Sequence, residues 1–171
     1  MQSKKRAIVV DIDSTIADVS ERAARATKGA GYMSAKWYDL FFDGELANKI
    51  DVPIEGSAAA LKELAEKYRL KIIYLSGRRD TMLAKTAAWL CRNGYPHGEV
   101  VLRPLGRGTI EFKREQALRL TDKYNVVTVV DDEPANLGIF YRAGVDFGVR
   151  AAGPKTWRGL VQLLFDQDLI Y

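Results

Sequence analysis

Five short apolar runs, rich in β-branched residues, recur along the chain and constrain its fold more than any other feature. Most are apolar at consecutive positions, so that both faces would be buried, and they stop at polar residues. Strands that are apolar on both faces are typical of a parallel sheet covered by helices on both sides. We therefore expect strands at residues 7–10, 72–75, 100–102, 126–130 and 145–149.

Helical patterns lie between these runs. Four helices are expected, at residues 57–69, 80–94, 111–124 and 134–144. Ser57 and Asp80 are candidate N-caps of the first two, and Pro134 lies in the first turn of the fourth. Strands that alternate with helices through short loops predict an α/β fold with a Rossmann-like, doubly wound parallel sheet and right-handed crossovers.

The stretch from Asp18 to about Val52 interrupts this alternation, with helical pattern but no strand signal. An insertion of roughly 35 residues is too short for a second hydrophobic core. The sequence therefore predicts one domain over residues 1–171, with a small helical cap inserted at about 18–52 after the first strand. Its aromatic residues are expected to pack inside it, and the alternative is that they stack on a base or cover a pocket. They are Trp37, Tyr38, Phe41 and Phe42.

Composition excludes several classes of protein. The 171 residues include one Cys and one His, so neither a disulfide framework nor a zinc site of Cys and His ligands is expected. Lys and Arg number 26 against 22 Asp and Glu, and the net charge of +4 is compatible with anionic partners without indicating one. No apolar run approaches the ~18 residues of a membrane span, and the N-terminus does not resemble a signal peptide. We expect a cytoplasmic protein with no membrane partner, and the oligomeric state stays open.

Polar residues follow the predicted strands where those strands end. In an open parallel sheet the carboxyl ends of the strands share one edge, and ligands bind there. Carboxylate, hydroxyl, ammonium and guanidinium groups should therefore meet at this edge. The residues concerned are Asp11, Asp13, Ser14, Thr15, Ser76, Gly77, Arg78, Arg103, Asp131 and Asp132, with Lys113 near the start of the third helix.

Each of these groups has a role in phosphoryl transfer. Crowded carboxylates bind a hard divalent cation such as Mg²⁺, and one carboxylate can attack phosphorus to give an acyl phosphate. A second carboxylate, with its pKa raised by its neighbour, can protonate the leaving alkoxide and later deprotonate water. Lys113 and Ser76 can stabilise charge on the phosphoryl oxygens. Taken singly, these motifs are typical of a solvated turn, a helix cap or a surface lysine, but their joint occurrence at one edge favours catalysis.

These motifs resemble the four motifs of the haloacid dehalogenase (HAD) superfamily. The resemblance extends over nearly the whole chain and implies a Rossmann-like core. It implies that Asp11 is the nucleophile and Asp13 the general acid and base, while Ser76 binds a phosphoryl oxygen and Lys113 bridges the nucleophile and the phosphoryl group. The matching segments are Val9–Thr15, Ser76, Lys113 and Val129–Asp132.

The same resemblance implies a Mg²⁺ site. Its ligands would be the Asp11 carboxylate, the backbone carbonyl of Asp13, and Asp131, with Asp132 as a further candidate. Aspartate at position 13 is similar to the phosphatase branch of the superfamily. Ser14 departs from the glycine that is usual at that position, although serine is small enough for a turn.

A narrower resemblance is to the 3′-phosphatase domain of polynucleotide kinases. It implies that Arg78 binds the substrate phosphate, and we extend this role to Arg103, with Ser14, Thr15 and Gly77 as further substrate contacts. Phosphatases of other substrates share much of the pattern, and no P-loop occurs in the sequence. The segments that carry the resemblance are Ser76–Arg78, Trp89–Leu90, Gly94–Pro96, Leu102–Pro104 and Phe112–Lys113.

The sequence thus predicts a Mg²⁺-dependent phosphomonoesterase that acts through an aspartyl phosphate, with 3′-phosphorylated nucleic acid or a nucleotide as substrate. A small metabolite phosphate is the alternative within the same class. A non-enzymatic, receiver-like signalling module is the alternative from another class, since it also joins acidic residues, a hydroxyl and a lysine on a parallel sheet. Its phosphorylated aspartate follows a middle strand, however, whereas the segment Asp11–Thr15 follows the first strand.

Overall fold

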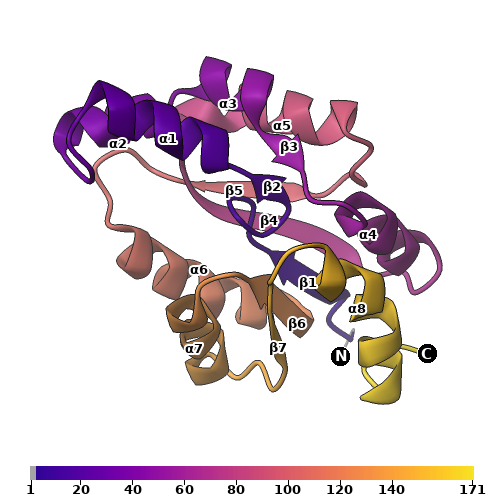
Figure 1. The fold of residues 1–171 in the computed structure, drawn as a ribbon. Helices are drawn as coiled ribbons and strands as arrows, with labels where there is room; N and C mark the ends of the chain where they lie inside the picture. The colour runs from indigo at the N-terminus through magenta and orange to yellow at the C-terminus, as the bar shows by residue number, and fades with distance from the viewer. Residues whose placement is uncertain (1–2) are drawn as a thin grey trace.

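A five-stranded parallel sheet forms the centre of the computed structural model, which describes residues 3–171 (Figure 1). The strands lie side by side in the order β5-β4-β1-β6-β7, so that β1 is central. This confirms the doubly wound parallel α/β fold expected from the sequence. The strands are β1 (Arg6–Val10), β4 (Lys71–Arg79), β5 (Glu99–Arg103), β6 (Asn125–Asp131) and β7 (Gly148–Arg150).

Helices cover both faces of this sheet because alternate residues of each central strand point to opposite sides. Ile8 and Val10 pack against α4, α5 and α8, whereas Ala7 and Val9 pack against α6 and α7. The two clusters lie on the two faces of one sheet, which supports our proposal that residues 1–171 form a single domain. The helices of the two layers are α4 (Ser57–Glu66), α5 (Leu83–Arg92), α6 (Thr109–Lys123), α7 (Pro134–Arg142) and α8 (Pro154–Asp166), and a 3₁₀ turn, η1 (Asp80–Met82), precedes α5.

The insertion after β1 consists of three short helices between two short strands. The helices are α1 (Ser20–Gly29), α2 (Ala35–Phe41) and α3 (Gly44–Ile50), and the strands are β2 (Ala17–Asp18) and β3 (Val52–Pro53). The two strands pair antiparallel, Ala17 with Pro53 and Asp18 with Val52. This ribbon is not predicted from the sequence, because two residues are too few to produce a period-2 pattern.

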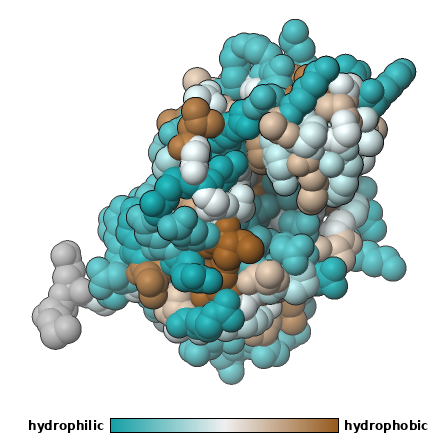
Figure 2. Space-filling view, turned by 90° about the vertical axis from the view of Figure 1, so that its left-hand side faces the viewer, coloured by the Kyte–Doolittle hydropathy of each residue, from teal (hydrophilic) through white to brown (hydrophobic). Residues whose placement is uncertain are grey.

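The insertion lies over the carboxyl end of the sheet, in the upper part of Figure 1, and α3 also packs against α5. From the side, Figure 2 shows a hollow between this upper part and the lower part that carries α6 and α7. Trp37 is buried and stacks on Phe41 with ring centroids 4.7 Å apart. Tyr38 remains exposed. The aromatic cluster is therefore divided between packing inside the insertion and the surface of this hollow.

Several predicted boundaries differ from the observed ones. The N-cap of α4 is Gly56, with a φ of 84°, and not Ser57; the left-handed backbone there favours glycine. The last strand runs from Gly148 to Arg150 rather than over 145–149, and α8 was not predicted. Asp80 lies in the 3₁₀ turn and does not cap α5. Across residues 3–171, no helix combines the length and the apolarity needed to cross a membrane.

Candidate active site

The predicted site residues meet at the carboxyl edge of the three central strands. Asp11 follows β1, Ser76 lies in the last part of β4, and Asp131 ends β6. Their exposed fractions are 6%, 1% and 2%. A buried polar group is stable only if it is paired or hydrogen-bonded, and the partners of these three residues define the site.

Lys113 connects two of the carboxylates. Its Nζ donates to Asp11 Oδ1 at 2.9 Å and to Asp131 Oδ2 at 2.7 Å. Burial alone would lower the pKa of Lys113, but the charges of Asp11 and Asp131 raise it above its ordinary value. Burial raises the pKa of Asp11 to about 8, against the effect of Lys113 and with the help of Asp131. Lys113 is therefore held as a buried cation, and its positive charge does not fully offset the cost of burying the negative charge of Asp11.

Asp132 completes an acidic cluster with Asp11 and Asp131. One carboxylate oxygen from each lies within 4.8 Å of the others. With all three carboxylates ionised, as a bound cation favours, and Lys113 protonated, the cluster carries two net negative charges, which matches the charge of one divalent cation. Oxygen atoms of carboxylates are the ligands that Mg²⁺ and similar hard cations prefer. The residues present therefore fit a divalent metal ion.

Hydrogen bonds outside the cluster fix two of these carboxylates. Asn136 Nδ2 and the backbone N–H of Glu133 donate to Asp131 Oδ1 at 2.9 and 3.0 Å. The Thr15 hydroxyl accepts from the backbone N–H of Asp132 at 3.0 Å and donates to its Oδ1 at 3.2 Å. Thr15 is fully buried. Its hydroxyl, predicted to contact the substrate, is bonded to Asp132 in the structure. Asn136 was missed by the sequence analysis, although its place in the first turn after Asp131–Pro134 was an available signal.

A tight turn carries the chain from Asp11 into the insertion. The carbonyl of Ile12 accepts the N–H groups of Thr15, Ile16 and Ala17 at 3.2, 2.9 and 2.9 Å. Ser14 lies in this turn with a φ of 62°, in the left-handed region that glycine adopts most readily. The positive φ at position 14 explains why glycine suits this position, and Ser14 shows that a small side chain is also accepted there.

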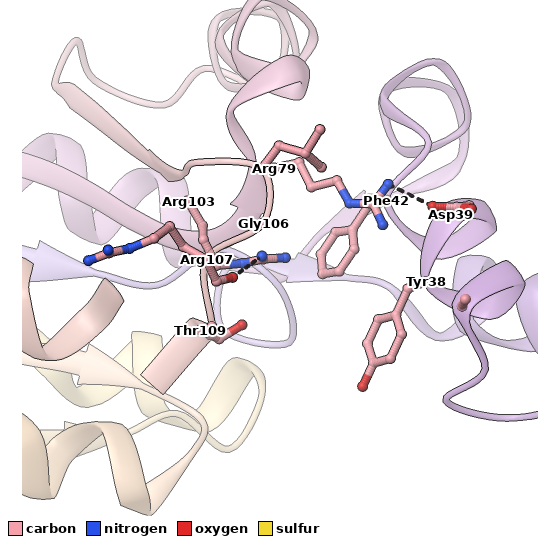
Figure 3. A pocket seen from close by; sticks show the side chains of 11 residues that line it. Tyr38, Asp39, Phe42, Arg79, Arg103, Gly106, Arg107 and Thr109 are labelled. Atoms are coloured by element: carbon pink, nitrogen blue, oxygen red, sulfur yellow. Dashed lines mark hydrogen bonds and ion pairs between the residues drawn. The ribbon is translucent and has the colours of Figure 1, made fainter. Parts of the chain in front are cut away.

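Ser76, Gly77 and Arg103 line the neighbouring part of the edge. The Ser76 hydroxyl accepts the backbone N–H of Arg78 at 3.2 Å. Arg103 Nε donates to the carbonyl of Gly77 at 3.0 Å, and Arg103 lines a surface cleft (Figure 3). A Cβ on Gly77 would lie 3.0 Å from Thr109 Cγ2. Gly77 therefore permits the close approach of the start of α6, the helix that carries Lys113.

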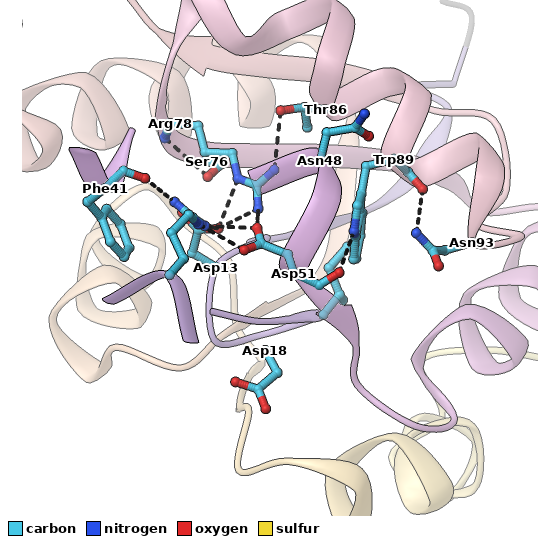
Figure 4. Close-up of polar contacts among 12 residues, drawn as sticks. Asp13, Asp18, Phe41, Asn48, Asp51, Ser76, Arg78, Thr86, Trp89 and Asn93 are labelled. Atoms are coloured by element: carbon cyan, nitrogen blue, oxygen red, sulfur yellow. Dashed lines mark hydrogen bonds and ion pairs between the residues drawn. The ribbon is translucent and has the colours of Figure 1, made fainter. Parts of the chain in front are cut away.

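The carboxylate of Asp13 is held by two arginines, Arg22 and Arg78, and Figure 4 shows its contact with Arg78. Its Oδ1 accepts from Arg78 Nε at 2.9 Å, from Arg78 Nη2 at 2.7 Å and from Arg22 Nη2 at 2.7 Å. Burial alone would raise the pKa of Asp13, but these two guanidinium groups lower it below its ordinary value. The expected upward shift of this pKa was therefore wrong, because the nearest charges are cations. The metal role predicted for Asp13 involves its backbone carbonyl and stays a prediction.

A second carboxylate, Asp51, completes this network. Its Oδ1 and Oδ2 accept from Arg22 at 2.8 and 3.0 Å, and Oδ2 also accepts from Arg78 at 2.7 Å. The side chains of Arg22 and Asp51 are fully buried. Neither residue is among the predicted site residues. Arg22 lies on the face of α1 that Ala26 also buries, and a charged residue on an apolar helix face is only a weak signal in the sequence.

Arg78 is occupied by protein partners. Besides its bonds to Asp13 and Asp51, its Nη1 donates to Thr86 Oγ1 at 3.3 Å. Only 1% of the residue is exposed. The role implied by the resemblance, direct binding of the substrate phosphate, stays a prediction, and the observed bonds connect the insertion to Asp13.

The arrangement has clear structural relatives. The class C acid phosphatase from Bacillus anthracis superposes with a TM-score of 0.65 at 22% identity, over 94% of this chain and 72% of that one. A chain of the Pnkp1/Rnl/Hen1 complex matches with a TM-score of 0.65 at 19% identity, over 88% of this chain and 48% of that one. The HAD domain of the effector Lem4 from Legionella pneumophila gives 0.58 at 14%, over 96% and 95%. At these identities the likeness establishes the fold, which is that of HAD-type hydrolases.

The sequence itself places the chain within that group. Residues 1–143 match the family described as HAD superfamily, subfamily IIIB (acid phosphatase). The chain belongs to this family and is a phosphatase, which confirms the resemblance found in the sequence and favours an enzyme over the receiver-like signalling module. No curated protein matches the chain significantly.

Proposed function

We propose that the protein is a Mg²⁺-dependent phosphomonoesterase that acts through an aspartyl phosphate on Asp11. The observation that carries this proposal is the bridge from Lys113 to Asp11 and Asp131, at 2.9 and 2.7 Å, beside Asp132. A buried carboxylate held between an ammonium and two further carboxylates suits a nucleophile that stays ionised once a divalent cation joins the cluster.

In the first step Asp11 attacks phosphorus, and the bond between phosphorus and the ester oxygen breaks. The leaving oxygen takes a proton from Asp13, so that an alcohol departs and Asp11 becomes an acyl phosphate. In the second step water attacks phosphorus, Asp13 takes the proton of that water, and phosphate leaves with Asp11 restored. General acid–base help of this kind contributes about 10²- to 10⁴-fold to a rate.

The bonds of Asp13 suggest which of its atoms moves the proton. Oδ1 accepts all of its hydrogen bonds to Arg22 and Arg78, and Oδ2 has no hydrogen-bond partner within residues 3–171. The lowered pKa favours the ionised form of Asp13, which is the form required of the base in the second step, and for the first step Oδ2 takes up a proton from solvent or from a monoanionic phosphate ester. Oδ2 is then the atom that carries the proton.

Asp11, Asp131 and Asp132 would hold the metal ion, with the carbonyl of Asp13 as a further ligand. When bound, a divalent cation neutralises charge on the phosphoryl oxygens and lowers the repulsion between them and the attacking carboxylate. Lys113 and Ser76 would bind the phosphoryl oxygens at the opposite side of the same edge.

We assign 3′-phosphorylated nucleic acid or a nucleotide as the substrate, and a small metabolite phosphate is the alternative. The polynucleotide-kinase-like sequence pattern supports this assignment, as does the fold shared with a chain of a complex described as an RNA repair complex. The net charge of +4 is compatible with an anionic polymer. We place the protein in the cytoplasm, in keeping with its single Cys.

Phosphate release from p-nitrophenyl phosphate and from a 3′-phosphorylated oligonucleotide tests this proposal. Activity should disappear with a chelator, return with Mg²⁺ and be absent in Asp11→Asn, whose melting curve should stay close to that of the wild type. Mn²⁺ in place of Mg²⁺ shows which metal the site prefers. Turnover that persists in Asp11→Asn, or in excess chelator, would overturn the mechanism.

A further inference from the structure

A cleft lies beside the catalytic edge, between the insertion and the loop that leads into α6. One wall comes from α2 and its end, with Tyr38 and Phe42, and the other comes from residues 103–109 (Figure 3). Its volume is about 580 Å³, comparable to the sites that hold small organic ligands. Figure 2 shows the hollow on this side of the molecule.

Aromatic rings form one wall of the cleft. The rings of Tyr38 and Phe42 are nearly parallel, with an interplanar angle of 9° and centroids 6.2 Å apart. Tyr38 is 38% exposed although its neighbour Trp37 is buried. Aromatic side chains that face an open cleft offer flat surfaces on which nucleic-acid bases stack without regard to sequence.

Two cations lie beside the ring of Phe42. The guanidinium of Arg103 lies 5.5 Å from the centroid of Phe42, and that of Arg79 lies 5.6 Å from it. Arg79 is paired with Asp39 at 2.9 Å, and Arg107, at the other end of the cleft, is paired with Glu115 at 2.7 Å.

Arg103 differs from both of these arginines. In the described part of the chain it has no carboxylate within salt-bridge distance, and its bonds go to the backbone carbonyls of Gly77 and Arg107. Burial, together with the charge of Arg79, lowers the pKa of Arg103, and the charge of Asp80 offsets this only in part. Arg103 is therefore a fixed cation beside another cation, an arrangement that favours the binding of an anion.

The chain connects this cleft directly to the catalytic edge. Arg78 and Arg79 are consecutive in β4, and their side chains go to opposite sides: Arg78 to Asp13, and Arg79 into the cleft. Arg103 bonds to the carbonyl of Gly77, the residue next to Ser76. A ligand in the cleft is thus adjacent to a phosphate bound at Ser76, and Arg103 is suited to a second phosphate rather than to the one that is removed.

We propose that this cleft binds the end of a single-stranded nucleic acid, with a base on Tyr38 and Phe42 and a backbone phosphodiester on Arg103. The inference rests on the proposed phosphatase function, and it makes the substrate a phosphorylated strand of at least two nucleotides. The paired charges of Arg79 and Arg107 leave Arg103 as the phosphate contact, and the parallel rings provide the stacking surface.

Binding can be tested apart from turnover. Asp11→Asn protein is titrated into fluorescent single-stranded tetranucleotides of DNA and RNA with a 3′-phosphate, and anisotropy is read at several salt concentrations. Tyr38→Ala in this background should weaken binding by about 5-fold or more, the loss of one stacked base. Arg103→Gln should reduce the slope of log K against log salt by about 0.7, the loss of one phosphate contact to a single strand.

A shorter ligand shows which phosphate Arg103 contacts. A 3′-phosphorylated mononucleotide has no internal phosphodiester, whereas a 3′-phosphorylated dinucleotide has one, so Arg103→Gln should change the binding of the mononucleotide far less than that of the dinucleotide. Matched controls are Tyr141→Ala and Arg142→Gln, a tyrosine and an arginine exposed on α7 and away from the cleft. Both should leave the binding of the strands unchanged. Melting curves of all variants confirm that they fold.

The outcomes separate this inference from the proposed function. If the wild type hydrolyses p-nitrophenyl phosphate with Mg²⁺ but Tyr38→Ala and Arg103→Gln bind the strands as their controls do, the cleft is not the binding site and the phosphatase mechanism stands. If Tyr38→Ala and Arg103→Gln weaken strand binding as expected but no ester is hydrolysed with any metal, the phosphatase mechanism fails and the assignment of the cleft as the binding site is kept. Equal effects of Arg103→Gln on mononucleotide and dinucleotide would contradict the assignment of Arg103 to an internal phosphate.

Discussion

Arg22→Met should destabilise the protein strongly, although Arg22 lies in the insertion and outside the acidic cluster. Methionine keeps an unbranched, flexible stem that reaches about as far as Nε and removes the guanidinium group with its charge and donors. In the wild type, Arg22 and Arg78 face Asp13 and Asp51, so the buried network is neutral. The substitution leaves two carboxylates with one guanidinium.

The size of the loss of unfolding free energy follows from the burial of Arg22 and Asp51. The side chains of Arg22 and Asp51 are both 0% exposed, so water cannot replace the missing charge. In the wild type, Arg22 Nη1 donates to the carbonyl of Phe41 at 2.5 Å, and the substitution removes this donor as well. Breaking a buried ion pair from one side costs about 3–5 kcal/mol, and we expect a loss of unfolding free energy in this range.

Urea unfolding followed by circular dichroism measures this loss. Arg25→Met is the matched control, because Arg25 lies on the same helix and pairs with Glu21 at the surface; it should cost no more than about 1 kcal/mol. The double variant Arg22→Met, Asp51→Leu restores neutrality and should lose less than the sum of the two single variants, by about 1–3 kcal/mol.

Two results would refute this reasoning. A cost of Arg22→Met as small as that of Arg25→Met would mean that the buried network does not hold the insertion on the core. Additivity of Arg22→Met and Asp51→Leu would mean that the two charges do not compensate each other. Either result would also remove the argument that the insertion fixes the position of Asp13.

Three further predictions concern single positions. Ser14→Gly should change the unfolding free energy by less than about 1 kcal/mol, because relief of the left-handed backbone and the added chain entropy oppose each other; a loss above about 2 kcal/mol in urea would contradict this. Asn136→Ala should weaken Mg²⁺ affinity about 10- to 100-fold, as for other residues that orient a metal ligand, and calorimetric titration that shows unchanged affinity would remove this role. Burial alone would raise the pKa of Glu99, but Tyr124 and two nearby cations lower it below its ordinary 4.5. Glu99 therefore stabilises the fold above about pH 4.5, and this contribution is lost as the pH falls through the lowered pKa. Urea unfolding of Glu99→Gln against the wild type should show a difference that shrinks in acid, and a constant difference would contradict the shift.

The parallel sheet and the acidic cluster could be predicted because their signals are local. Asp11 and Asp131 follow apolar runs directly, and the carboxyl ends of parallel strands must share an edge. Lys113 is further along the chain, but the helix that carries it begins at that same edge. The position of each residue thus follows from the element next to it.

The network around Asp13 could not be predicted in this way. Arg22 and Asp51 lie 29 residues apart on the insertion, and their pairing depends on how three short helices fold back over the sheet. Neither residue follows a strand, and a charged residue in a short helix is ordinarily solvated. The downward pKa shift of Asp13 was missed for the same reason, since its cause is charge brought in by tertiary structure.

The short ribbon and the cleft required the structure as well. Two-residue strands give no periodic signal, and Ala17 and Pro53 pair only because the insertion returns to its starting point. Tyr38 and Phe42 stood out in the sequence as aromatic residues, but their exposure beside Arg103 depends on the loop after β5. Sequence patterns indicate which groups are present, and the packing of the insertion decides which of them line the cleft.

Covalent labelling shows whether Asp11 is the nucleophile. The wild type is mixed with a phosphate ester and Mg²⁺, quenched in acid during turnover and treated with borohydride, which reduces an aspartyl phosphate. Peptide mass spectrometry then locates the reduced residue. We expect the modification at Asp11 and none at Asp13, and no modification without Mg²⁺. Reduction at another residue, or steady turnover with no modified Asp11 at any quench time, would contradict this expectation.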